Sequence, residues 1–119
     1  MKKPISPKMH GIIDYAFTSA QIIVPSVLGV NKKADRLFKL LGSNLMIYNS
    51  LTNHGTSVKP VIPFKTHMYI DNYNLLGLFL LTAYKPIRKD RKALGFHLGF
   101  LALATLNVLL TDTSSADKE

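Results

Sequence analysis

A long stretch without a charged side chain, 93–111, contains Leu98-Gly99-Phe100-Leu101-Ala102-Leu103-Ala104-Thr105-Leu106-Asn107-Val108-Leu109-Leu110. Only Thr105 and Asn107 in this run are polar, so a helix formed here is apolar almost all the way round. A surface helix of a soluble protein instead carries a broad polar face that recurs every 3.6 residues. The run therefore predicts a helix that is surrounded by lipid.

Three other segments are also poor in Asp, Glu, Lys and Arg. A helix crosses the hydrocarbon core of a bilayer with about 20 residues, and ~17–25 is the usual range. The sequence thus predicts spanning helices at about 10–30, 37–52, 67–84 and 93–111. The predicted fold class is all-α, a four-transmembrane-helix bundle that forms a single integral-membrane domain over 1–119.

Composition narrows the class of protein further. The chain has 119 residues, of which 47% are hydrophobic and 18% charged, which is too apolar for a disordered chain. Cysteine is absent, so disulfides, thiolate zinc sites and cysteine nucleophiles are excluded. The formal charge of +8 suits nucleic acid or an anionic membrane. Because the basic residues cluster in the connections, we expect a lipid bilayer as partner and no nucleic acid.

The basic residues also predict an orientation. If the helices alternate in direction, both termini and the central connection share side A, and the other two turns share side B. Side A then has 6 basic residues: Lys2, Lys3, Lys8, Lys59, Lys65 and Lys118. Side B has 9: Lys32, Lys33, Arg36, Lys39, Lys85, Arg88, Lys89, Arg91 and Lys92. For this multi-pass arrangement the positive-inside rule predicts that side B is cytoplasmic and that the termini are outside.

The two halves of the chain resemble each other. Lys8-Met9-His10-Gly11-Ile12-Ile13-Asp14-Tyr15 aligns with Lys65-Thr66-His67-Met68-Tyr69-Ile70-Asp71-Asn72, so His-x-x-x-Asp occurs twice. Ser50-Leu51-Thr52-Asn53 also echoes Leu109-Leu110-Thr111-Asp112, at an offset two residues larger. The chain is therefore predicted to contain two similar helical hairpins, at about 6–54 and 63–112.

The order of several motifs resembles a known family. The motifs are Ser6-Pro7-Lys8-x-His10-Gly11-x-x-Asp14-Tyr15, Pro25-Ser26-Val27-Leu28-Gly29, Leu51-Thr52-Asn53 and Ile62-Pro63-x-x-x-His67-x-x-x-Asp71. Together they resemble the small bacterial four-helix membrane proteins of the SPW-repeat type, although Ser26 stands where that family has tryptophan. The resemblance implies a polytopic inner-membrane protein and brings no established activity.

The alternating topology places nearly all the chemically versatile side chains on side A. The candidate ligand or metal residues are His10, Asp14, His54, His67, Asp71 and Asp112. A spacing of four residues puts each histidine on the same helix face as the aspartate that follows it, so each His is expected to bond its own Asp. His97, near side B, is expected to meet interfacial water or the basic turn.

Three interpretations of this side A cluster stay open. It joins helix ends in a structural or accessory membrane component, with Asp at the positive end of a helix dipole. Alternatively, His10 and His67 ligate a metal ion or haem, with Asp as a further partner. A proton-linked pocket for a small solute is the third reading.

Enzymatic activity is not predicted, because the chain has no nucleophile elbow, phosphate-binding glycine loop or His-Glu-x-x-His motif. A homo-oligomer or a membrane-protein partner is expected, since four short helices bury little surface. Close helix contacts are predicted at the small residues Gly42, Gly77, Gly95 and Gly99.

Overall fold

The structure is a computed structural model that describes residues 3–114, and every regular element in this range is a helix. The four long helices are α1 (Pro7–Leu28), α2 (Lys32–Ser50), α3 (Phe64–Leu81) and α5 (Arg91–Leu109). A short helix, α4 (Lys85–Arg88), lies in the connection between α3 and α5 and was not predicted. The all-α prediction is confirmed, and the long helices fall close to the four predicted segments.

Local sequence signals explain where the first helix begins and ends. Ser6 is the N-cap of α1, because its Oγ accepts a hydrogen bond from the backbone N–H of Met9 at 3.1 Å. Pro7 occupies the first helical position, where no amide donor is needed. Gly29 ends the helix in the left-handed region, at φ 74°.

The second helix ends earlier than the sequence suggests. The helix is predicted to end at about 52, whereas α2 ends at Ser50 and Gly55 takes φ 94° within the following loop. The chain leaves the helix because Thr52 forms an isolated parallel bridge with Ile62, just before α3. A similar bridge joins Ile5, just before α1, to Thr111, just after α5. The two bridges tie the start of one helix to the end of another.

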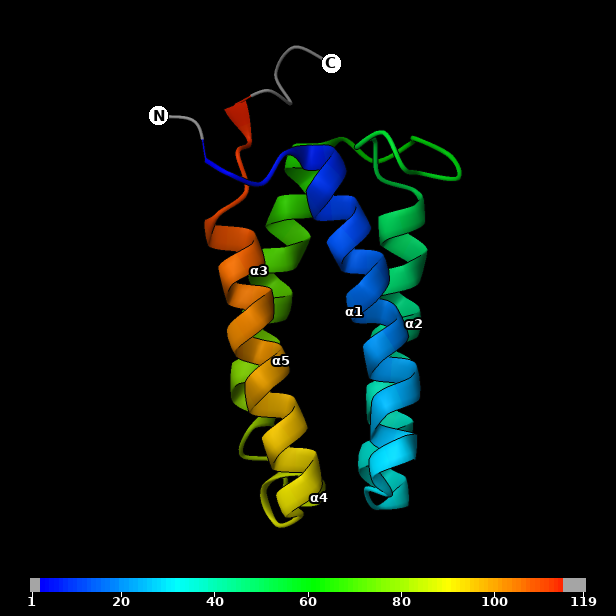
Figure 1. The fold of residues 1–119 in the computed structure, drawn as a ribbon, viewed down its shortest axis with the longest axis vertical. Coiled ribbons are helices and arrows are strands. Elements are labelled where there is room, and N and C mark those ends of the chain that lie inside the picture. Colours follow the sequence, from blue (N-terminus) through cyan, green and yellow to red (C-terminus); the bar gives the residue numbers. More distant parts are fainter. Residues whose placement is uncertain (1–2, 115–119) are drawn as a thin grey trace.

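The long helices run alternately up and down (Figure 1). α1 packs against α2 and α5, and α5 also packs against α3. Residues 51–63, the segment before α1 and the segment after α5 all lie at one end, the predicted side A. The α1–α2 turn and α4 lie at the opposite end, the predicted side B. Two residues of the side A charge count, Lys2 and Lys118, lie outside the described part of the chain.

The interior changes character from one end to the other. Near side B it is an apolar cluster of Ala34, Phe38, Ile87 and Ala93, all fully buried. Towards side A many of the buried side chains are polar, and they include three histidines and two aspartates. The same assembly of helices therefore has an ordinary apolar core at one end and a polar centre at the other.

Within residues 3–114, two helices are long and apolar enough to cross a membrane: α1 and α5. The first two turns of α2 instead carry charged residues on several positions: Lys32, Lys33, Asp35, Arg36 and Lys39. One of them, Asp35, pairs with Lys39 one turn later.

Only one of the four glycines expected at helix contacts has a close neighbour. A Cβ at Gly42 would lie 3.0 Å from Ile22 Cγ1 and 3.1 Å from the carbonyl oxygen of Thr18, so α1 and α2 approach closely there. At Gly77, Gly95 and Gly99 a Cβ would meet nothing within 4 Å. The prediction of close contacts is wrong at these three positions, because Gly95 and Gly99 are exposed and Gly77 borders a cavity between the helices.

We predict opposite effects for two glycine substitutions. Gly42→Ala should lower the free energy of unfolding by about 1–3 kcal/mol, because a methyl group must fit against backbone atoms of α1. Gly99→Ala should leave stability unchanged or raise it by up to about 1 kcal/mol, since alanine favours the helix. Thermal unfolding of the detergent-purified variants measures both effects, and equal destabilisation by the two substitutions would contradict the packing of α1 on α2.

Candidate metal centre

Four side chains from α1 and α3 meet inside the side A half of the protein: His10, Asp14, His67 and Asp71, here called the quartet. Each residue offers one ligand atom, and the four atoms lie within 4.8 Å of one another. Both histidines are fully buried, and the two aspartates are 3% and 7% exposed. The quartet is thus a compact, buried group of two imidazoles and two carboxylates.

The shortest contacts within the quartet cross from one helix to the other. Nε2 of His10 lies 2.8 Å from Asp71 Oδ2, and Nε2 of His67 lies 2.8 Å from Asp14 Oδ2. The contacts within one helix, His10 to Asp14 and His67 to Asp71, are longer, at 3.2 Å each. The expectation that each His bonds chiefly to its own Asp is wrong, because α1 and α3 face each other and bring the opposite carboxylate closer.

Two threonines hold the outer nitrogen of each imidazole. His10 Nδ1 lies 2.8 Å from Thr111 Oγ1, and His67 Nδ1 lies 2.8 Å from Thr52 Oγ1. These threonines lie in the two bridges described above, directly after α5 and α2. The bridges therefore place a hydroxyl group behind each histidine ring.

The threonine hydroxyls also determine which imidazole nitrogen carries a proton. Thr52 Oγ1 donates to the carbonyl oxygen of Tyr48 at 2.5 Å, and Thr111 Oγ1 donates to that of Asn107. With its hydrogen engaged, each hydroxyl accepts from the imidazole, so Nδ1 carries a proton in both rings. Each Nε2 then faces the carboxylates, where it either carries a second proton or shares a cation with them.

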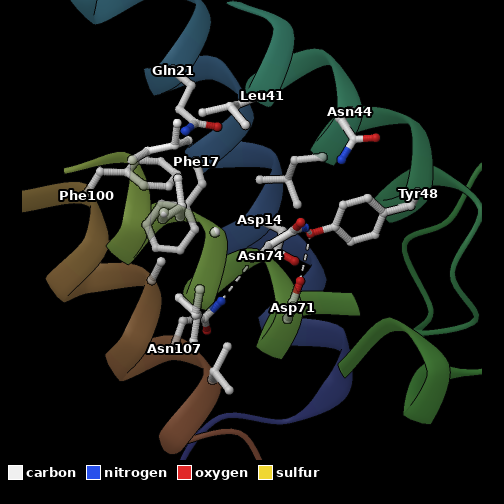
Figure 2. A pocket seen from close by; sticks show the side chains of 17 residues that line it. Asp14, Phe17, Gln21, Leu41, Asn44, Tyr48, Asp71, Asn74, Phe100 and Asn107 are labelled. Carbon is white, nitrogen blue, oxygen red and sulfur yellow. Dashed lines mark hydrogen bonds between the residues drawn. The ribbon is translucent and has the colours of Figure 1, made fainter. Parts of the chain in front are cut away.

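Each carboxylate has one further partner on its outer oxygen. Tyr48 O–H donates to Asp71 Oδ1 at 2.8 Å, and the Asn107 amide donates to Asp14 Oδ1 at 3.2 Å (Figure 2). Asn74 in turn donates to the Tyr48 hydroxyl at 2.9 Å. Every member of the quartet is therefore oriented by a second polar group, as metal-binding His and Asp side chains commonly are.

The other two predicted site residues lie outside the quartet. His54 is buried next to His67, with ring centroids 6.1 Å apart, but both of its nitrogens are engaged elsewhere. Its Nδ1 accepts from the backbone N–H of Thr56, and its Nε2 donates to the carbonyl oxygen of Asn49. Asp112 lies beyond α5, where its carboxylate accepts from the backbone N–H of Ser114.

His54 instead packs the loop against α1. A Cβ at Gly11 would lie 2.6 Å from the His54 ring, so only glycine leaves room for the imidazole. Burial lowers the pKa of His54 below its ordinary value, and the hydrogen bond that it donates to Asn49 opposes this shift. The neutral imidazole is therefore the form that suits the folded state.

His97 does not meet interfacial water, so that expectation is wrong. Its side chain is 1% exposed, and Nε2 donates to the carbonyl oxygen of Leu78 on α3 at 2.8 Å. The ring also stacks on Phe38, with centroids 6.1 Å apart. His97 is buried because α5 packs against α3 and turns this helix face inward.

Sequence reasoning missed the residues that orient the quartet: Tyr48, Thr52, Asn107 and Thr111. The signal that points to them is the alignment of the two halves, in which Thr52 matches Thr111. Tyr48 and Asn107 each stand four residues before the matched threonine, and so occupy corresponding positions.

The fold and the site together define an all-helical protein with a buried centre of two histidines and two aspartates. Comparisons with protein-family models, curated proteins and solved structures give no significant match to this chain. The resemblance to the SPW-repeat type stays a prediction that rests on the sequence motifs.

We predict that His54 makes stability depend on pH. Its folded-state pKa lies below the unfolded value of about 6.5, so the stability it contributes is complete above that value and declines as pH falls. The difference in melting temperature between the wild type and His54→Gln should therefore be largest near pH 7.5 and shrink towards pH 5. A difference that stays constant over this range in detergent-purified samples would contradict the neutral assignment.

Proposed function

We propose that this chain is a small integral-membrane structural component whose two helical hairpins are joined by one buried divalent metal ion of the zinc type. The observation that carries the metal site is the convergence of four ligand atoms, Nε2 of both histidines and Oδ2 of both aspartates, within 4.8 Å. In this proposal the structural and metal-binding readings of the cluster are one function, because the metal is what holds the hairpins together.

The distribution of polarity supports the membrane part of the proposal. In the described residues, twelve polar or charged side chains are buried against ten hydrophobic ones, the reverse of what a soluble core requires. The helix surfaces are covered by large hydrophobic side chains: Ile23, Val27, Leu40, Ile47, Tyr69, Tyr73, Phe79, Leu80, Leu103 and Leu109, all more than half exposed. An outward apolar surface around a polar centre is favourable in lipid and unfavourable in water.

The arrangement of the charges supports a metal ion over simple ion pairs. Two separate His–Asp pairs have no need to meet, and bringing both carboxylates to one point sets like charges against each other. A shared divalent cation between the two carboxylates offsets that repulsion and leaves the quartet neutral without a second proton on either imidazole.

The distances also suit a small tetrahedral ion. Zinc bonds to His and Asp measure about 2.0–2.2 Å, so neighbouring ligand atoms lie roughly 3.3 Å apart. The four His–Asp separations in the quartet are 2.8 Å or 3.2 Å, so small side-chain movements create the site. Four protein ligands make a closed, structural type of centre. Haem is disfavoured, because each Nε2 already faces a carboxylate and a porphyrin cannot fit between the rings.

The metal proposal predicts one zinc ion per chain. Protein purified in mild detergent and titrated with Zn²⁺ should hold about one equivalent by elemental mass spectrometry, and Co²⁺ should give a tetrahedral absorption spectrum. His10→Gln should abolish both signals, whereas His97→Gln, which changes a buried histidine outside the quartet, should retain them. Thr52→Val should weaken binding about 10- to 100-fold, because it removes the group that orients His67.

Two outcomes would contradict the metal site. One is wild-type protein that binds no Zn²⁺ or Co²⁺ at neutral pH. The other is binding of equal affinity in the wild type and in a folded His10→Gln protein. If His10→Gln does not fold, the affinity of Thr52→Val decides the question, since that variant keeps all four ligands.

The topology proposal, with four spans and side B in the cytoplasm, predicts the labelling of introduced cysteines. The natural chain has no cysteine, so Lys59→Cys and Lys89→Cys each provide one thiol, at an exposed position on side A and on side B. A membrane-impermeant maleimide should label Lys59→Cys in intact cells and Lys89→Cys only after permeabilisation. Recovery of the chain in the soluble fraction, or labelling of both variants in intact cells, would contradict the topology.

A further inference from the structure

A second feature lies beside the quartet: a cavity of about 110 Å³ between the four long helices (Figure 2). Each long helix contributes one carboxamide side chain to its lining: Gln21 from α1, Asn44 from α2, Asn74 from α3 and Asn107 from α5. The remaining walls are largely apolar and include two phenylalanine rings whose centroids are 5.1 Å apart, Phe17 and Phe100. The cavity thus combines apolar walls with four carboxamides, and Asp14, Asp71 and Tyr48 also border it.

Gln21 is the member of this set that points to a ligand. Its side chain is only 3% exposed, it lines the cavity, and no hydrogen-bond partner for its amide exists among the described residues 3–114. Asn74 and Asn107 each donate one hydrogen bond, to Tyr48 and Asp14, and Asn107 Oδ1 has no partner among the described residues. An occupant of the cavity that bonds to the Gln21 amide is therefore stabilising, because it supplies a hydrogen-bond partner that the described chain does not.

Charge and volume limit what this occupant is. The lining contains no Lys, Arg or His, and its two carboxylates, Asp14 and Asp71, are already engaged by the quartet and by Asn107 and Tyr48. A neutral molecule therefore fits better than an ion in an apolar interior. An engineered cavity of about 150 Å³ holds benzene, so about 110 Å³ admits a molecule of roughly five non-hydrogen atoms.

We propose that the cavity binds a small neutral amide. A carboxamide such as that of Gln21 both donates and accepts, and its best complement is another amide that accepts at one atom and donates at the other. The apolar part of the ligand lies against the phenylalanine rings. The cavity adjoins the metal centre and shares Asp14 and Asp71 with it, but the ligand that we propose bonds to Gln21 and not to the quartet, so neither proposal requires the other.

Two isomeric probes test the proposal in detergent-purified protein by ligand-observed NMR titration. Propionamide has five non-hydrogen atoms and donates N–H, whereas dimethylformamide has the same atoms and no donor. Propionamide should bind the wild type about tenfold more tightly than dimethylformamide, the worth of one hydrogen bond to a buried group. Gln21→Met, which removes the amide and keeps the length of the side chain, should weaken propionamide binding by a similar factor.

A matched pair of variants on α5 locates the site. Ala104 lines the cavity and Ala102 is exposed on the same helix, so Ala104→Leu should abolish propionamide binding while Ala102→Leu preserves it. If propionamide does not bind to the wild type, the cavity holds only water. If propionamide and dimethylformamide bind equally, the N–H donor of the ligand has no role. Either result overturns the proposal. Zinc content, measured on the same samples, reports separately on the metal centre.

Discussion

The contact between an imidazole on one helix and a carboxylate on another is the interaction on which the side A half of this protein depends. His10 reaches Asp71 on α3, and His67 reaches Asp14 on α1, so neither helix can shift along the other without breaking both contacts. The threonines that follow α2 and α5 bond to the same imidazoles and bring the ends of those helices into the arrangement. All four long helices are therefore coupled through four buried side chains.

The coupling of the helices through these side chains requires a polar interior in the side A half, although the outer surface of the helices is apolar. In water, burying two histidines and two aspartates is a large cost that a small domain with few buried apolar side chains can hardly offset. In the lipid surroundings that we propose, the alternative location for these groups is the lipid-facing surface of the helices, which costs more free energy than the interior. Gathering them into one neutral centre is therefore favourable. The apolar cluster around Phe38 near side B then needs to supply only ordinary packing. The metal centre and the amide cavity that we propose are both consequences of placing polar groups inside an apolar exterior.

The sequence allowed much of this arrangement to be predicted. Long uncharged runs predict the helices, Ser6 and Pro7 predict where the first one begins, and the repeated His-x-x-x-Asp identifies the members of the quartet. It did not allow the crossed pairing to be predicted, because a spacing of four residues within one helix is visible in the sequence and the distance between two helices is not. For the same reason His97 was expected at the interface, although α3 covers it, and Asp112 was grouped with the cluster, although it lies beyond the end of α5.

The sequence by itself thus determined the helical class, the approximate helix ends and the residue types available for a site, because propensity, capping and the lengths of apolar runs are local properties. Tertiary structure alone decided which of these residues meet. The two bridges set Thr52 and Thr111 behind the imidazoles, and the facing of α1 and α3 set each histidine against the opposite aspartate. The cavity next to Gln21 likewise depends on four helices at once. Such arrangements depend on the distances and angles between helices, which no single stretch of the chain specifies.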